Sequence, residues 1–229
     1  IFSRMNVGAW SVNLRHRWNY GLGVFHTAGA YQDAIGYVYF ERKAGGSLIA
    51  SYPFSRFRRF EGTAQIYYDD KDRGFGFSRR GLLTTHSLSL IRDNTLWFGT
   101  GPRDGSRYNL TGAVTTNWNQ GRTENVTLSA DLRRYLRTSQ WTTIALRAQA
   151  RWSEGADPQR FAMGGSYSIR GYPRRSIFGT RYYLMNAEYR FPLFERLRLG
   201  VPLQGFELPG VESAVFADAG NAWEKFESF

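Results

Sequence analysis

Apolar and polar side chains alternate with a period of two along most of the chain, which is typical of β-strands with one apolar and one polar face. The clearest cases are residues 58–70, 124–134 and 142–152. Roughly ten such segments occur, each close to the ~10 residues with which a tilted strand crosses a bilayer. No run approaches the ~18 apolar residues of a membrane-spanning helix. The alternation therefore predicts an all-β, antiparallel fold.

The expected strands cover residues 7–14, 20–27, 37–52, 58–70, 82–92, 108–118, 124–134, 142–152, 182–191 and 212–220. In the third segment Gly45 and Gly46 interrupt the pattern, so that one kinked strand or two short strands fit. Proline-aromatic turns are expected at 52–57 and 191–194, and long connections at 70–81 and 153–180. If the strands alternate in direction, the two kinds of connection fall at opposite ends, as in outer-membrane barrels.

Two all-β architectures remain, a soluble sandwich and a transmembrane β-barrel. Their difference lies in which residues occupy each face, because a sandwich needs a core of large aliphatic residues. Here the apolar faces mix aliphatic residues with Ala and Gly, and the opposite faces carry Arg, Asp and Glu in mid-strand. Aromatic residues gather near strand ends, as at Trp97, Trp118, Trp141 and Trp152. This distribution favours a barrel with a lipid-facing outer surface, aromatic girdles and a charged lumen.

Composition restricts the function. The chain has no cysteine, and its three histidines show no metal-ligand spacing, so we expect no metal and no cofactor. No catalytic motif is present, and an enzyme is not expected. The net charge of +11, with 27 Arg among 30 basic residues, suggests an anionic partner such as nucleic acid, lipid phosphate or an acidic polypeptide. A genome that favours arginine codons explains the same bias.

The segment 162–176 differs from an ordinary connection. It contains Gly164 and Gly165, then Ile169, Arg170, Gly171 and Tyr172. An arginine next to glycine offers a planar fork of donors at a sterically free tip. A mobile basic loop is the alternative interpretation. Two carboxylates, Glu188 and Asp218, lie on the polar faces of the following strands, where such an arginine could reach them.

Three motifs resemble the outer-membrane assembly and translocation superfamily of the BamA, TamA and FhaC type, also described as bacterial surface antigen barrels. The tip from Ile169 to Tyr172 resembles the superfamily's Arg-Gly-aromatic loop tip. Residues 186–193 resemble the strand that follows, and residues 216–223 resemble its Phe-x-Asp-x-Gly strand. Residues 52–61 resemble barrels that carry a TolB-like propeller ahead of the barrel.

This resemblance implies a bacterial outer-membrane protein in which the loop folds back into the barrel lumen. Arg170 would then meet Glu188 and Asp218 on the inner wall, with Gly164, Gly165, Phe216 and Gly220 in supporting positions. Superfamily barrels have about sixteen strands. Residues 1–229 are therefore expected to form part of one barrel domain, without its first and last strands and without any periplasmic domain.

The function that the resemblance implies is a non-enzymatic polypeptide insertase or translocator. The alternatives are a structural anchor for an envelope complex and, more weakly, a passive pore. The implied partners are outer-membrane lipids, unfolded or secreted polypeptides and periplasmic domains or accessory envelope proteins, but not nucleic acid. Arginines expected near outer loops could contact lipopolysaccharide phosphates; they are Arg73, Arg79, Arg80, Arg174 and Arg175.

Overall fold

The computed structural model describes residues 5–32, 38–72, 78–98, 101–198 and 207–224, and the regular elements in them are β-strands. The strands are β1 (Val7–Asn13), β2 (Asn19–Gln32), β3 (Val38–Ser55), β4 (Arg58–Asp72), β5 (Ser78–Asp93), β6 (Leu96–Phe98), β7 (Gly101–Asn117), β8 (Arg122–Arg137), β9 (Thr143–Glu154), β10 (Phe161–Met163), β11 (Ile177–Gly179), β12 (Arg181–Arg198) and β13 (Glu207–Trp223). In this part of the chain, no helix is long and apolar enough to cross a membrane.

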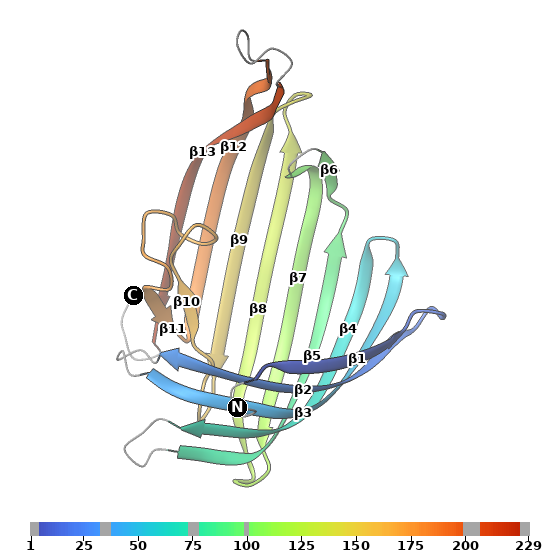
Figure 1. Cartoon of the computed structure of the whole chain (residues 1–229), viewed down its shortest axis with the longest axis vertical. Helices are drawn as coiled ribbons and strands as arrows, with labels where there is room; N and C mark the ends of the chain where they lie inside the picture. The colour runs from blue at the N-terminus through green and yellow to red at the C-terminus, as the bar shows by residue number, and fades with distance from the viewer. Residues whose placement is uncertain (1–4, 33–37, 73–77, 99–100, 199–206, 225–229) are drawn as a thin grey trace.

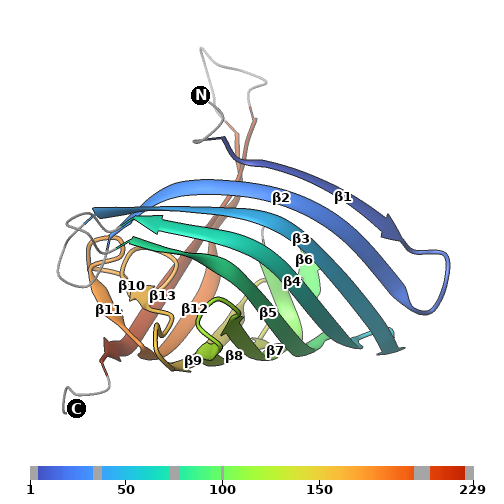
Figure 2. The same ribbon diagram turned by 90° about the horizontal axis from the view of Figure 1, so that it is seen from below.

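One antiparallel sheet dominates the structure. Its strands follow the order β1-β2-β3-β4-β5-β7-β8-β9-β12-β13, and β6 pairs with β7 outside this path. The sheet is strongly curved (Figure 1), and in Figure 2 it encloses the short hairpin β10-β11 on its concave side. Strands that pair in chain order need no crossover, so short turns suffice to build the curved wall. The prediction of an all-β, antiparallel fold is confirmed.

The two faces of this sheet are sharply different. On the convex face Leu22, Leu88 and Val215 expose 62%, 70% and 66% of their surface. On the concave face the carboxylates of Asp69 and Glu124 are fully covered. A soluble sandwich would place its large aliphatic residues in the interior. Apolar side chains on the convex face and carboxylates on the concave face are the arrangement expected of a barrel wall that contacts lipid.

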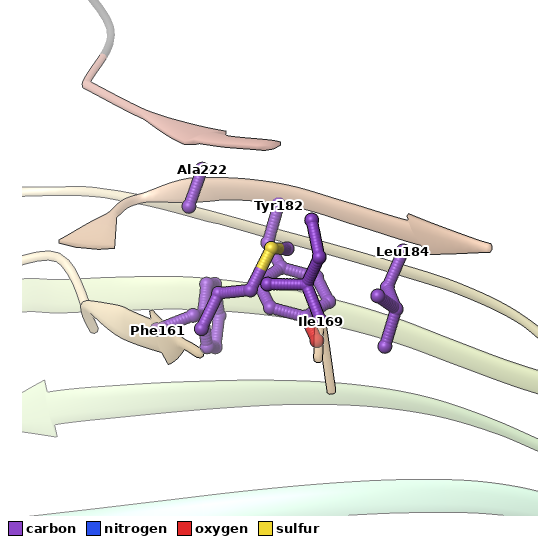
Figure 3. Packing of buried hydrophobic residues seen from close by; sticks show 6 residues of the cluster. Phe161, Ile169, Tyr182, Leu184 and Ala222 are labelled. Carbon is purple, nitrogen blue, oxygen red and sulfur yellow. The ribbon is translucent and has the colours of Figure 1, made fainter. Parts of the chain in front are cut away.

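A small apolar cluster lies on the concave face, under the segment between β9 and β12. It contains Phe161, Met163, Ile169, Tyr182, Leu184 and Ala222, with Ile177 packed against it. Figure 3 shows Phe161 of β10 and Ile169 of the segment between β10 and β11 next to Tyr182 and Leu184 of β12. The expected long connection at 153–180 therefore contains the hairpin β10-β11 and packs part of the concave face as a dry core. The inner face, for which a charged lumen was expected, is apolar at this place.

Of the two expected proline-aromatic turns, the one at 191–194 is wrong, and the one at 52–57 is confirmed but is shorter than expected. Residues 191–194 lie inside β12, which pairs with β13 on both sides of a register shift between Pro192 and Phe194. Residues 52–55 likewise lie inside β3, with a register shift between Pro53 and Ser55, and only residues 56–57 form the turn. Proline lacks the N–H that the ladder needs, so it produces a bulge here and does not end the strand.

The interruption at Gly45 and Gly46 does not divide the third strand. β3 is continuous and pairs with both β2 and β4 through these glycines. A Cβ at Gly45 would collide with the backbone of β4 at Ile66 and Tyr67. The glycine is therefore required by the close approach of two strands, and the interpretation as one strand holds.

The exposed apolar face makes a specific prediction about Leu88, which lies near the middle of β5. We expect Leu88→Lys to lower the free energy of unfolding in lipid vesicles by about 2–4 kcal/mol, because a lysine near the bilayer midplane is poorly solvated. The matched change Ser87→Lys, on the concave face, should cost less than about 1 kcal/mol. Denaturant titration in vesicles measures both, and equal costs would contradict the assignment of the two faces.

Candidate functional site

Arg170 makes its principal contacts with Asp218 on β13. The backbone N–H donates to Oδ2 at 3.0 Å, Nε donates to the same oxygen at 2.7 Å, and Nη2 donates to Oδ1 at 2.5 Å. Both carboxylate oxygens are thus engaged by the guanidinium fork, which is the geometry that lysine cannot reproduce. The side chains of Arg170 and Asp218 expose only 20% and 4% of their surface.

Glu188 on β12 receives the remaining arm of the guanidinium. Arg170 Nη1 donates to Oε1 at 2.6 Å, and Arg190 Nε donates to Oε2 at 2.8 Å. Two carboxylates and two guanidiniums therefore balance each other in charge, which offsets part of the cost of withdrawing them from water. The hydrogen bond with Asp218 raises the pKa of Arg170 above its ordinary value, and the group stays charged.

Two further neighbours fix the orientation of this ion pair. The ring of Phe216 lies under the guanidinium, with 3.6 Å between its centroid and Arg170 Cζ, which is a close cation-π contact. Asn186 Nδ2 donates to Asp218 Oδ1 at 2.7 Å and to the backbone carbonyl of Ser168 at 2.8 Å. The amide therefore connects the wall both to the carboxylate and to the tip segment.

A second attachment lies on β8 and β9. Arg147 Nη1 donates to the backbone carbonyl of Tyr167 at 3.1 Å, and its Nη2 donates to Asp131 Oδ2 at 2.8 Å. Arg133 binds the same carboxylate through Nε and Nη2 at 2.9 and 2.8 Å. Asp131 thus orients Arg147, which binds the backbone of the segment. The segment is therefore bound to the wall at two places, through Arg170 and through Arg147.

The glycines of the segment share a positive φ but differ in the space available for a side chain. Gly164, Gly165 and Gly171 have φ values of +114°, +95° and +87°, a region that favours glycine. A Cβ at Gly164 would collide with the carbonyl of Pro173, whereas a Cβ at Gly171 would meet nothing within 4 Å. The two ends of the loop from Gly165 to Tyr172 are joined by a hydrogen bond, in which the Gly165 N–H donates to the carbonyl of Tyr172 at 3.1 Å. Gly164 therefore allows the segment to fold on itself.

Of the other residues singled out from the sequence, Ile169 is buried in the apolar cluster, whereas the side chain of Tyr172 is 53% exposed. A Cβ at Gly220 would lie 2.8 Å from the carbonyl of Tyr183 and 3.1 Å from Met163 Cε. Gly220 therefore leaves room for β10 against β13. All ten residues singled out belong to this one region.

Sequence reasoning missed several members of the site. Asn186, Arg190, Arg147 and Asp131 were seen only as polar positions on their strands, because alternation gives a face but not a partner. The apolar cluster had a visible signal in Tyr182 and Leu184, which place apolar side chains on the polar face of β12. Such a break in the alternation indicates that another part of the chain covers that place.

A curved antiparallel sheet with an apolar convex face and a charged, partly covered concave face is the wall of a transmembrane β-barrel. A profile of the Omp85 superfamily domain matches residues 12–228. The chain belongs to the Omp85 superfamily, and it is accordingly part of a β-barrel of the bacterial outer membrane. A search of curated protein sequences found no match.

Among solved structures, the chain is similar to the crystal structure of BamA from Haemophilus ducreyi lacking POTRA domains 1–3. The TM-score is 0.77 at 16% sequence identity, and the match covers 96% of this chain and 49% of that chain. The chain thus spans about half the length of that relative. At this identity the likeness concerns the fold, and it agrees with a barrel wall of roughly ten strands.

We expect Arg170→Ala to free the segment 164–176 from the wall. The loss leaves Asp218 and Glu188 less well compensated, and the free energy of opening the segment should fall by about 2 kcal/mol, or ~30-fold in protease cleavage. Arg174→Ala is the matched control, because Arg174 is an exposed arginine of the same segment. Arg170→Lys should resemble Arg170→Ala, since the fork is lost. Equal protease resistance of Arg170→Ala and the unaltered protein would contradict this account.

A second comparison separates the effect of backbone strain from that of a steric collision. Gly164→Ala and Gly171→Ala both place an L residue at positive φ, at a cost of about 1–3 kcal/mol each. Only the first also forces a methyl group against the Pro173 carbonyl. We expect Gly164→Ala to expose the segment to protease more than Gly171→Ala does. Hydrogen exchange of the Gly165 amide reports the same difference, and the reverse order would contradict the geometry.

Proposed function

We propose that this barrel serves a polypeptide insertase or translocator of the outer membrane, and that the segment 164–176 is an internal strut folded into the barrel lumen. The observation that carries the proposal is the engagement of Arg170 by both Asp218 and Glu188, on two neighbouring strands. A charged group given so many partners restricts the relative movement of β12 and β13 where the segment crosses them.

The chemistry of the site suits positioning and not bond breaking. Each ionised group of the cluster already has a partner of opposite charge within hydrogen-bond distance. A general base or nucleophile needs an available lone pair near a reacting atom. We therefore propose a non-enzymatic role in which the segment holds the wall in a defined shape while polypeptide substrates are handled.

The partners we propose are outer-membrane lipids, unfolded or secreted polypeptides, and a periplasmic domain or accessory envelope proteins. Of the arginines considered for lipopolysaccharide, Arg174 is exposed and Arg80 donates to Asp70 Oδ1 at 2.9 Å. Arg73 and the side chain of Arg79 lie outside the described residues. Arg174 and Arg175 belong to the segment that we place in the lumen, and Arg175 lines an inner cavity with Tyr39 and Glu41, so we assign them no lipopolysaccharide contact.

The alternative is that the barrel anchors a periplasmic domain or an envelope complex. A β-propeller ahead of the barrel would favour this role, whereas tandem POTRA domains would favour the insertase. In an anchor the strut would stabilise the wall without affecting any other polypeptide. The two functions therefore differ in what loss of the strut does to a second protein.

The test uses the full-length protein reconstituted in liposomes, with an unfolded outer-membrane β-barrel protein added as substrate. We expect Arg170→Ala and Asp218→Asn to slow insertion of the substrate by about tenfold, the size of a typical coupling between sites. Arg174→Ala should leave the rate unchanged. If Arg170→Ala loosens the segment in the protease assay but insertion proceeds at the unaltered rate, the anchor is the correct function.

A further inference from the structure

A groove on the convex, apolar face of the sheet lies behind the strands that hold the strut, and its lining includes Arg147, Asn186 and Asp218. It has a volume of 570 Å³ and crosses β7, β8, β9, β12 and β13. Its floor consists of the alanines Ala148, Ala187, Ala217 and Ala219. Leu132, Leu146 and Met185 rise beside them and expose 46%, 40% and 58% of their surface. The groove is therefore a depression of alkane character in the lipid-facing surface.

The strand register explains the shape of this groove. Two neighbouring cross-strand rows form the groove. The first row is Leu132, Ala148, Met185 and Ala219, and the second row is Arg134, Leu146, Ala187 and Ala217. Small residues fall beside large ones within each row, so the surface is hollowed and not flat. An extended hydrocarbon chain fits a hollow of this kind, since dispersion contacts are then made on several sides.

Arginines lie at one end of the groove: Arg134 lines it, and Arg92 lies beside its lining residue Tyr108. Arg134 begins the second row and lies opposite Ser106 on β7. Leu132 begins the first row and lies opposite Tyr108, and Tyr108 lies opposite Arg92 on β5. Arg92 in turn lies opposite Arg58 on β4. Arginines therefore stand on both sides of Tyr108, at the end of the sheet where β3 turns into β4.

As far as the structure describes them, the cross-strand rows of this arginine group offer it no opposite charge. Nε of Arg92 is buried and has no hydrogen-bond partner among the described residues. The two rows that carry Arg92 and Arg134 contain no carboxylate. Like charges directly opposite each other across two strands, as in Arg58 and Arg92, are destabilising, and more so beside hydrocarbon than in water. The arrangement therefore favours an external anion.

We propose that this groove is a binding site for an anionic glycerophospholipid. The phosphate is bound by Arg92 and Arg134 beside the hydroxyl groups of Tyr108 and Ser106, and one acyl chain lies along the alanine floor. Guanidinium groups bind phosphate through two parallel hydrogen bonds, which fits two arginines near one headgroup. The inference rests on the lipid-facing assignment of this surface and not on the insertase proposal, so the two fail independently.

The charge pattern selects among lipids. Phosphatidylglycerol brings a phosphate without a cation, whereas the ammonium group of phosphatidylethanolamine would be placed near several guanidiniums. We therefore expect preference for phosphatidylglycerol. Glycerol phosphate carries the same anion without acyl chains, and it should displace the lipid poorly because it leaves the apolar groove empty.

The experiment is native mass spectrometry of the full-length protein released from nanodiscs that contain equal amounts of phosphatidylglycerol and phosphatidylethanolamine. We expect one phosphatidylglycerol to stay bound, and the double variant Arg92→Gln, Arg134→Gln to reduce its retention about tenfold. Arg56→Gln is the matched control, because Arg56 is an exposed arginine at the same end of the sheet but lies in neither of the two cross-strand rows.

The hydrocarbon part is tested by filling the groove. Ala148→Leu should displace the bound lipid. Ala64→Leu adds the same side chain to another groove of the convex face, which has a volume of 670 Å³ and no arginine in its lining, and it should leave retention unchanged. Circular dichroism confirms that each variant is folded. If Ala148→Leu does not fold, the arginine variants still decide the proposal.

Several results would overturn it. Equal retention of the two lipids would show that Arg92 and Arg134 do not select the phosphate. Equal loss of phosphatidylglycerol in Arg56→Gln and in the double variant would show the same. Full displacement by glycerol phosphate would show that the groove contributes nothing. Protein dimers that disappear in Ala148→Leu would show that a second copy of the chain fills the groove.

Discussion

The bidentate ion pair between Arg170 and Asp218 is the interaction on which the candidate site depends. It is formed in a place where a charge has little water, since Asp218 exposes only 4% of its side chain. Withdrawal of either group alone would leave the other poorly solvated, so the pair is kept together by the cost of separating it. Glu188, Asn186 and Phe216 raise that cost further, because each is positioned by the same contact.

The wall supports this pair through the register of its strands. Asn186 lies opposite Asp218, and Glu188 lies opposite Phe216, so that two consecutive rows of β12 and β13 bring all four side chains to one face. A slip of one residue would turn them all to the lipid side. The apolar exterior, which prohibits such a slip, therefore also protects the site, and fold and site are specified by the same alternation.

Much of this was readable from the sequence, and the reasons for the failures are physical. The alternation placed Leu88 outside and Glu188 inside because the side-chain period of a strand is fixed. It could not show that Arg147 and Asn186 donate hydrogen bonds to backbone carbonyls of the segment 164–176, since such contacts depend on how a long connection packs. Pro192 was taken for a turn because proline often ends strands, whereas an antiparallel pair can accommodate it as a bulge.

That bulge has a mechanical consequence. β12 and β13 continue beyond it, with Leu197 opposite Leu208, so the hairpin consists of two ladders in series joined by an irregular step. A step that lacks one donor bends more easily than the regular ladders beside it. A load on the paired residues beyond the step would thus bend the step first, and the ladder that carries Asp218 would keep its alignment.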